Sequence, residues 1–307
     1  MNNNTKPLVT VTVSSYNHQN YIKKTIESII NQSYGFENIE LITIDDCSTD
    51  DTGKILKELS RKYDFRFFQN ESNKGVVNNM NSLLRVASGK YIAGCASDDY
   101  WHIEKLEKQV SIMEAAGVEY AVCHTKAFII DTDDNFLFFQ DRGNLFQENI
   151  IPKILTDNGI VAPSVLIKKS VYDAIGLYDE SLPFEDREMW IRMAQYYKFI
   201  YINEPLVYRR HHPNNLGRNI NAHYESYSGI FKKYYKLFEE YNKTDEYHFI
   251  MFNTMAGANF KIALKHLSKS WRLVLRKNPM RLLKLFTAHS FTNSRFGLKV
   301  KSYFGKW

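Results

Sequence analysis

The residues best suited to chemistry in this 307-residue sequence are aspartates that directly follow runs of apolar residues. Asp45 and Asp46 follow one such run, and Asp98 and Asp99 follow another. A carboxylate held at the end of a rigid strand can bind a hard divalent cation that keeps open positions for phosphate oxygens. The alternative for both pairs is that they are solvated or cap the helices that follow.

The elements that must position these carboxylates alternate between strand and helix over the first 100 residues. Strands are expected at 8–13, 39–44, 65–68 and 91–94, and helices at 21–30, 55–59 and 76–87. Short connections between them indicate a parallel sheet with helices on both faces. In such sheets, ligands bind outside the carboxyl ends of the strands. We therefore expect the polar cluster at 14–17 and both aspartate pairs to form one site.

The second half of the sequence is less regular. Strands are expected at 121–130, 164–167, 201–202 and 206–208, and helices at 170–175 and 185–197. From Tyr224 to about Leu285 the pattern is helical throughout, and Pro279 is well placed to start a new helix. We predict an α/β domain over residues 1–219 and a helical appendage over 220–307.

The charge of the chain is divided unevenly. The net charge is +6, but residues 247–307, the basic tail, contain twelve Lys or Arg and no Asp or Glu. Residues 1–246 therefore carry about −6 (28 basic against 34 acidic residues). Apolar residues alternate with the basic ones at helical spacing, which suits a helix lying on an anionic membrane surface. An equal alternative is packing against the domain or another subunit of a homo-oligomer. No recognition motif for nucleic acid accompanies the charge.

Features of cellular location are few. No N-terminal segment has the pattern of a cleaved secretory signal, and no apolar stretch reaches the roughly 18 residues that a membrane-spanning helix needs. Cys47, Cys95 and Cys123 lack metal-ligand spacing and are interpreted as reduced thiols. These features predict a cytoplasmic protein, which the basic tail would hold peripherally on the inner face of the cell membrane.

The sequence resembles the family 2 glycosyltransferases over about residues 8–215, in an ordered series of short motifs. Each motif is weak by itself, but their order along the chain is specific. The motifs lie at 11–17, 44–52, 73–75, 89–92, 97–101, 163–164, 176–180, 185–192 and 208–211.

The resemblance implies a GT-A-like fold, which is a mixed, mainly parallel sheet flanked by helices, here followed by the C-terminal helical appendage. Residues 1–105 would form the nucleotide-binding half and residues 106–219 the acceptor half. The implied reaction moves a hexose or N-acetylhexosamine, with inversion, from a UDP-linked nucleotide sugar. The implied acceptor is a glycan or a lipid-linked oligosaccharide in surface polysaccharide synthesis, and the implied cofactor is Mg²⁺ or Mn²⁺.

The resemblance also assigns roles to single residues. Asp98 falls on the metal-binding aspartate, and Asp186 falls on the general base. His211 falls where some family members add a metal or diphosphate contact. The positions that hold the nucleotide base are Ser14, Tyr16 and Asp46, with Asp45 beside them.

One position departs from the family pattern. The family commonly has an aspartate two positions before Asp98, and this sequence has Ala96 there. We therefore expect Asp98 to be the principal carboxylate on the metal, with Asp99 and His211 assisting. The chemistry is consistent, because a bound cation offsets the charge of a diphosphate leaving group and a single displacement needs one carboxylate as base.

Several of these residues have ordinary alternatives. Asp186 would equally suit the first turn of a helix, where acidic residues are favoured. Arg209 and Arg210 either bind phosphate or belong to a solvated basic loop. The sequence offers no partners for His18, His102 and His124, so they are interpreted as structural.

Two other functions remain open from the sequence. A catalytically idle nucleotide-sugar or glycan-binding protein would have no need for both Asp98 and Asp186. A nucleotidyltransferase would ordinarily open with a glycine-rich phosphate-binding turn, and residues 14–17 contain no glycine. A dehydrogenase is disfavoured for the same reason.

Overall fold

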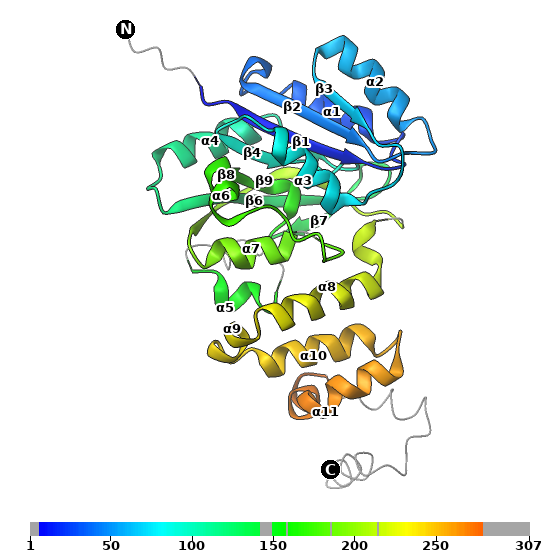
Figure 1. The fold of residues 1–307 in the computed structure, drawn as a ribbon, viewed down its shortest axis with the longest axis vertical. Coiled ribbons are helices and arrows are strands. Elements are labelled where there is room, and N and C mark those ends of the chain that lie inside the picture. The colour runs from blue at the N-terminus through cyan, green and yellow to red at the C-terminus, as the bar shows by residue number, and fades with distance from the viewer. Residues whose placement is uncertain (1–5, 142–148, 158, 185, 214, 279–307) are drawn as a thin grey trace. The chain divides into compact units, whose positions relative to one another are not determined.

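The computed structural model describes residues 6–141, 149–157, 159–184, 186–213 and 215–278. The chain divides into two compact units, Met1–Arg218 and Asn219–Trp307, each described here by itself (Figure 1).

The first half of the first unit is a parallel sheet with strand order β3-β2-β1-β4. Its strands are β1 (Val9–Ser15), β2 (Ile39–Asp45), β3 (Arg66–Gln69) and β4 (Tyr91–Gly94). The connecting helices are α1 (Ile22–Ile30), α2 (Thr52–Tyr63) and α3 (Val76–Val86). α1 and α2 lie side by side over the sheet (Figure 1), and α3 packs against β1 and β2. The alternation of strand and helix expected from the sequence is confirmed.

β1 lies at the centre of this arrangement and is buried on both faces. Val9, Val11 and Val13 are fully buried, and so are Thr10 and Thr12 on the other face. A strand without a solvated face requires helices on both sides of the sheet. The β-branched run near the N-terminus therefore determines which strand is central.

The second half of the unit continues the same sheet in the order β4-β8-β6-β9-β5, with β7 paired to β6. These strands are β5 (Tyr100–Trp101), β6 (Tyr120–Ile130), β7 (Phe136–Gln140), β8 (Leu166–Lys168) and β9 (Lys198–Arg210). β6 and β9 run parallel, whereas the other new pairs are antiparallel. The fold is thus the mixed α/β sheet predicted from the sequence.

β9 replaces the two short strands expected at 201–202 and 206–208. Its register against β6 shifts between Thr125 and Ala127, where Lys126 pairs with Pro205. Proline cannot donate a ladder hydrogen bond, so its place at an irregularity is expected. The apolar pattern of the sequence is interrupted at this point, although the strand continues.

The helices described in the second half of the unit are α4 (Lys105–Ala115), α5 (Ile151–Ile154), α6 (Lys169–Ile175) and α7 (Asp186–Ala194), of which α5 packs against α7. Lys105, at the start of α4, is fully buried. Its Nζ lies 2.7 Å from Gln109 Oε1 and 4.0 Å from the centre of the Trp101 ring. Burial lowers the pKa of this amine to about 7. The contact holds β5 against α4 beneath the Asp98–Asp99 loop.

The second unit consists of helices in the described residues: α8 (Ile220–Lys233), α9 (Tyr235–Glu240), α10 (Thr244–Met255) and α11 (Phe260–Lys277). Ala263, Leu267 and Val274 of α11 are buried in a cluster with Phe252 and Met255 of α10. The exposed side of α11 carries its basic residues, Lys261, Lys265, Lys269, Arg272, Arg276 and Lys277.

The apolar stripe of α11 is therefore packed inside the unit, which favours the packing alternative for this part of the basic tail. The expected helix start at Pro279 lies outside the described residues. Within the described part of the chain, no helix combines the length and apolarity needed to cross a membrane.

Two buried histidines face each other between α10 and α11. His248 Nδ1 lies 2.8 Å from His266 Nδ1, so one ring donates a hydrogen bond to the other. Burial lowers the pKa of each to about 4, with further repulsion from His248 on His266 and from Lys269 on both. The pair is therefore neutral at physiological pH.

We expect the helical unit to lose stability as the pH falls from 6.5 towards 4. In that interval the unfolded chain binds protons at His248 and His266 while the folded unit does not, so the free energy of unfolding decreases. Above pH 6.5 the pair contributes no pH dependence. Thermal unfolding of the full chain followed by circular dichroism measures the effect. The double variant His248→Gln, His266→Leu should show a flatter profile, and an unchanged profile would contradict the assignment.

Candidate active site

The loop after β1 joins the carboxyl ends of its two neighbouring strands. On one side, the backbone N–H of Asp46 donates to the Ser15 carbonyl at 2.8 Å. On the other side, His18 Nδ1 lies 2.7 Å from the hydroxyl of Ser97. The three polar clusters expected to form one site therefore do meet, around the end of the central strand.

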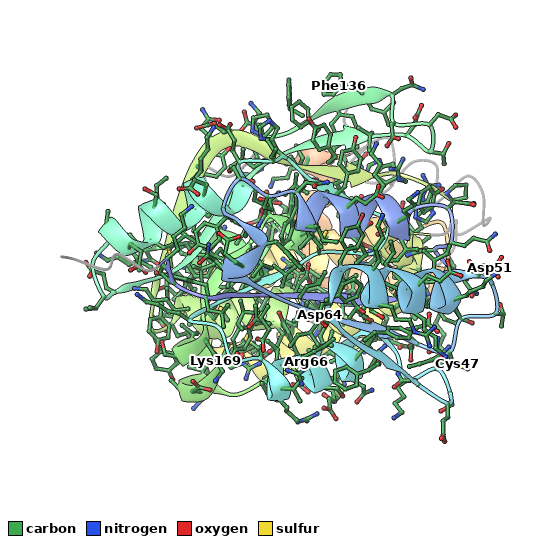
Figure 2. The ribbon with its side chains drawn as sticks, turned by 90° about the horizontal axis from the view of Figure 1, so that it is seen from above. Cys47, Asp51, Asp64, Arg66, Phe136 and Lys169 are labelled. Atoms are coloured by element: carbon green, nitrogen blue, oxygen red, sulfur yellow. The ribbon has the colours of Figure 1, made fainter. Side chains whose placement is uncertain are left out.

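The loops after β1 and β2 are also interlocked by their side chains. Asn17, at a positive φ of 55°, accepts a hydrogen bond from the backbone N–H of Thr49 at 2.8 Å. Cys47 has a φ of 61°, so the chain turns sharply just after the aspartate pair. Figure 2 shows Cys47 and Asp51 together at this end of the unit, away from Lys169. These contacts make the rim of the site rigid.

Asp98 belongs to a group of three side chains that together could hold a metal ion. His18, Asp98 and His212 each offer one ligand atom, and the three atoms lie within 4.8 Å of one another. Asp98 Oδ2 is 2.9 Å from His212 Nε2 and accepts a hydrogen bond from Asn215 Nδ2 at 3.0 Å. The Ser97 hydroxyl orients His18, as outer partners commonly orient metal-binding histidines.

The protonation states of this group suit a cation. Burial acts to raise the pKa of Asp98, but the hydrogen bond with His212 and the nearby His18 hold that pKa below its ordinary value. Burial lowers the pKa of His18, despite the attraction of Asp98. Metal ligands must be a carboxylate or a neutral imidazole, and these are the forms that Asp98 and His18 adopt at neutral pH.

The histidine beside Asp98 is His212, whereas the sequence analysis assigned this contact to His211. β9 ends at Arg210, and successive side chains of an extended chain point in opposite directions. The His211 ring lies 5.9 Å from the Phe138 ring of β7, while His212 is 5% exposed and faces Asp98.

Sequence reasoning also missed His18, which it interpreted as structural. Its contact with Ser97 spans 79 residues of sequence, so no local pattern announces it. Its place in the sequence is the one signal that could have indicated a role in the site, because His18 directly follows the polar cluster at the end of β1.

Asp99 is anchored in the protein and does not join the group around Asp98. Its Oδ1 accepts a hydrogen bond from the backbone N–H of Arg210 at 2.7 Å, and its side chain is 4% exposed. Burial and the neighbouring Asp98 raise its pKa well above the ordinary value. The expected role of Asp99 in sharing the metal with Asp98 gains no support from this placement, which instead connects β9 to the loop after β4.

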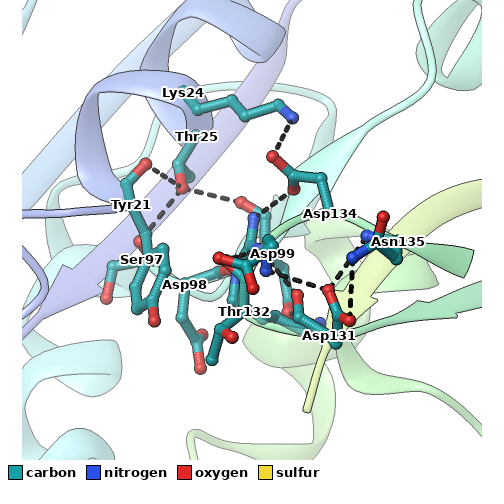
Figure 3. A network of polar contacts seen from close by, with 12 residues as sticks. Tyr21, Lys24, Thr25, Ser97, Asp98, Asp99, Asp131, Thr132, Asp134 and Asn135 are labelled. Carbon is teal, nitrogen blue, oxygen red and sulfur yellow. Dashed lines mark hydrogen bonds and ion pairs between the residues drawn. The ribbon is translucent and has the colours of Figure 1, made fainter. Parts of the chain in front are cut away.

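Arg210 is neither solvated nor free to bind phosphate, because it is 2% exposed and hydrogen-bonded within the protein. Its Nε donates to the Asp98 carbonyl at 3.0 Å. Its terminal nitrogens donate to the Asp131 carbonyl at 2.8 Å and to Asp134 Oδ1 at 2.7 Å. Lys24 of α1 pairs with the same Asp134 at 2.8 Å (Figure 3). Arg210 thus fixes the turn between β6 and β7 to the loop that carries Asp98.

A polar crevice of about 370 Å³ opens beside this contact. Its lining combines hydroxyl, amide and charged groups with one aromatic ring, a composition that suits a hydroxylated ligand. The lining residues are Asn20, Tyr21, Lys24, Thr132, Asp133, Asp134 and Arg210.

The two aspartates after β2 differ in the hydrogen bonds that their carboxylates accept within the protein. Asp45 is fully buried and accepts hydrogen bonds from Ser48 and Gln69. Asp46 accepts three, from Asn70 and from the backbone N–H groups of Lys74 and Gly75, at 2.8, 2.8 and 2.9 Å. Since a carboxylate has about four acceptor positions, Asp46 retains one.

Ser14 lies on the same side of the site as Asp46, and Tyr16 follows it two residues later in the chain. The Ser14 hydroxyl accepts a hydrogen bond from Asn79 Nδ2 at 3.2 Å, and Asn79 accepts one from Asn70, which also donates to Asp46. The Tyr16 side chain is 43% exposed. A planar base would use an exposed aromatic ring for stacking and an unfilled acceptor position for a hydrogen bond.

Asp186 lies at the start of α7, outside the group around Asp98. It is half-buried, and its Oδ1 accepts a hydrogen bond from the backbone N–H of Arg187 at 2.6 Å. Arg187 donates to the Ile154 carbonyl at 3.0 Å, and the buried Glu188 pairs with Arg192 at 2.9 Å. The contact of Asp186 is that of an acidic residue in a first helical turn, on a helix that its neighbours fix in place.

Comparisons with known proteins bear on the whole arrangement. The chain is 32% identical over 187 residues to an uncharacterized glycosyltransferase of Rickettsia bellii, covering 61% of this chain and 26% of that protein. It is 38% identical over 116 residues to the Escherichia coli UDP-Glc:alpha-D-GlcNAc-diphosphoundecaprenol beta-1,3-glucosyltransferase WfaP, covering 37% of this chain and 44% of that protein. Each match thus covers less than half the length of the relative.

Solved structures share the fold at low sequence identity. TarS of S. aureus in complex with UDP-GlcNAc superposes with a TM-score of 0.61 at 15% identity, covering 86% of this chain and 88% of that one. The mannosyltransferase PcManGT of Pyrobaculum calidifontis, in complex with GDP-Man and Mn²⁺, gives 0.62 at 15% identity, covering 98% and 85%.

The sequence match to the family itself covers more than half of the chain. Residues 10–175 match the family described as glycosyl transferase family 2, and this range holds β1, β2, β4 and Asp98. The chain belongs to glycosyl transferase family 2.

Proposed function

We propose that this protein transfers a hexose or N-acetylhexosamine from a UDP-sugar to a glycan acceptor in polysaccharide synthesis, with inversion. The observation that carries the proposal is the group of His18, Asp98 and His212 at the same sheet edge as Asp46 and Tyr16. A metal-binding group beside a base-binding position is what a nucleotide diphosphate requires. The names of the E. coli and S. aureus proteins, which contain UDP-Glc and UDP-GlcNAc, support a UDP-sugar.

The residues around Asp98 fit a divalent cation. Mg²⁺ strongly prefers oxygen ligands, whereas one carboxylate with two imidazoles suits a metal that accepts both nitrogen and oxygen. We therefore favour Mn²⁺ over Mg²⁺, with His18, Asp98 and His212 holding it. When bound, the cation offsets the negative charge that develops on the diphosphate leaving group. Asp99 and His211 contribute indirectly, through β9.

Donor binding falls to the half formed by residues 1–105. Tyr16 would stack on the base, and Ser14 would lie beside it. The acceptor position left on Asp46 matches the single ring N–H that uracil offers as a donor. Asp45, being fully buried, would support the loop and not touch the base.

Acceptor activation falls to residues 106–218, through Asp186. A hydroxyl that attacks the anomeric carbon must lose its proton, and a positioned carboxylate accepts it in a single displacement. The fixed start of α7 provides the rigid position that this role requires. A catalytically idle nucleotide-sugar binder is the second candidate, and the experiment on Asp186 below separates the two.

Replacing His212 should weaken Mn²⁺ binding, whereas replacing His211 should not. His212→Ala removes one of the three donors, so we expect affinity to fall at least about tenfold. His211→Ala, at the neighbouring position beside Phe138, is the matched control. Mn²⁺ titration followed by electron paramagnetic resonance measures the free ion directly and needs no substrate.

Equal losses in both histidine variants would refute the assignment of His212. Retention of full metal-dependent activity in Asp98→Ala would remove Asp98 as the principal carboxylate.

Replacing Asp186 with asparagine should abolish turnover while UDP-sugar binding is unchanged. Loss of a general base typically lowers kcat by about 10²–10⁴-fold. The matched control is Asp173→Asn on α6, an exposed carboxylate that pairs with Lys169. Donor binding is measured by thermal stabilisation with a panel of nucleotide sugars, which also identifies the donor, and turnover by release of nucleoside diphosphate. Binding without turnover in the wild-type protein would favour the idle binder.

A further inference from the structure

β7 exposes four consecutive apolar side chains at an edge of the sheet, here called the β7 apolar edge. Phe136, Leu137, Phe138 and Phe139 are 53%, 48%, 49% and 46% exposed. Among the described strands, β7 pairs with β6 alone, so its second side is open. Figure 2 shows Phe136 at the rim of the unit, on the opposite side from Arg66. A contiguous exposed apolar patch of this kind marks an interaction surface.

The β7 apolar edge is apolar on both faces of the sheet. The register shift between Ile129 and Ile130 leaves Phe136 and Phe139 on one face, where their rings lie 6.2 and 5.3 Å from Phe128. Phe138 points to the other face, beside His211. A groove on a protein partner would cover one face, whereas a fluid apolar layer covers both faces and the open side together.

Cationic side chains border the β7 apolar edge. Arg209 donates to Gln140 at 3.0 Å. The exposed Arg218 acts electrostatically on His211, whose ring lies 5.9 Å from that of Phe138. Within the described residues, neither Arg209 nor Arg218 has a carboxylate partner. Guanidinium groups pair well with phosphate, so these two complement a phospholipid headgroup layer.

One of the three acidic residues in the adjoining turn is ion-paired. Asp134 is paired with both Lys24 and Arg210, and Asp131 accepts hydrogen bonds from Asn135. Asp131 and Asp133 have no ion pair among the described residues. Counted as formal charges, Lys24, Arg209, Arg210 and Arg218 face Asp131, Asp133 and Asp134, so four positive charges around the β7 apolar edge outnumber three negative ones.

The β7 apolar edge is also continuous with the candidate active site. Stacked rings run from Tyr100 to Tyr208 and Phe128 at 4.4 and 4.6 Å, and Phe139 follows. The faces of these rings are covered by one another, so they are poorly placed to stack on a sugar. Together they form an apolar ridge that suits contact with lipid. Arg210 fixes the same hairpin to the Asp98 carbonyl.

We infer that the β7 apolar edge docks the protein on a phospholipid membrane, with residues 136–139 in the apolar layer and Arg209 and Arg218 at the phosphates. Docking would place the active site at the height above the membrane where a lipid-linked acceptor carries its sugar. This reason for docking rests on the proposed function, whereas the membrane contact itself is independent of it. A second copy of the chain pairing along the open side of β7 is the competing occupant.

The test is co-sedimentation of the full chain with vesicles of phosphatidylcholine and phosphatidylglycerol at high salt, which screens the charges of the basic tail. The variant is Phe136→Ser with Phe139→Ser. The matched control is Ile103→Ser with Val118→Ser, two apolar residues that are 54% and 91% exposed elsewhere on the unit. We expect the test variant to lose at least about tenfold in vesicle affinity, since two phenyl rings no longer enter the apolar layer, and the control to bind like the wild-type protein.

Equal vesicle binding by both variants would overturn the inference, and so would absence of binding by the wild-type protein. A wild-type dimer in size-exclusion chromatography that only the Phe136, Phe139 variant loses, without a change in vesicle affinity, would assign the β7 apolar edge to a second copy. Hydrolysis of a UDP-sugar in solution should be the same in all three proteins. Docking without any such hydrolysis would count against the proposed function alone.

Discussion

The buried guanidinium of Arg210 is the contact on which the arrangement of the site depends. A buried cation must be hydrogen-bonded and paired, because leaving it unpaired is strongly unfavourable. Arg210 meets that requirement by binding the Asp98 carbonyl, the turn after β6 and Asp134, while its backbone N–H holds Asp99. Arg210 therefore joins the loop that carries Asp98, the strand β9 and the β6–β7 hairpin. The positions of both the candidate active site and the β7 apolar edge depend on this connection.

Two adjacent aspartates acquire different properties from this arrangement. Asp98 faces His18 and His212 and stays ionised, whereas Asp99 is buried beside Asp98 and its pKa is raised. One carboxylate is thus available to a cation while the other binds the backbone. In the proposed metal site, the two histidines would provide the donors that an aspartate at the position of Ala96 would otherwise contribute.

The proposed membrane contact uses residues other than those that the charge pattern alone suggests. The apolar residues of α11 are used in the core of the helical unit, and its basic residues remain exposed. The β7 apolar edge, in contrast, leaves aromatic residues without cover. The apolar contribution to docking would then come from the catalytic unit, and the charge of α11 would add only a long-range attraction that salt screens.

The sequence by itself determined the strand and helix order of the first half, because apolar periodicity and turn residues are local signals. It also determined that Asp98 and the polar residues after β1 and β2 share one edge, since parallel strands end on the same side. Only the tertiary structure decided that His212 and His18, not His211, accompany Asp98, that Arg210 is buried, and that β9 is one strand. Those contacts join residues that are 79 to 114 positions apart in the sequence. Which side chain contacts a distant partner depends on strand register and packing, and no local sequence pattern encodes either.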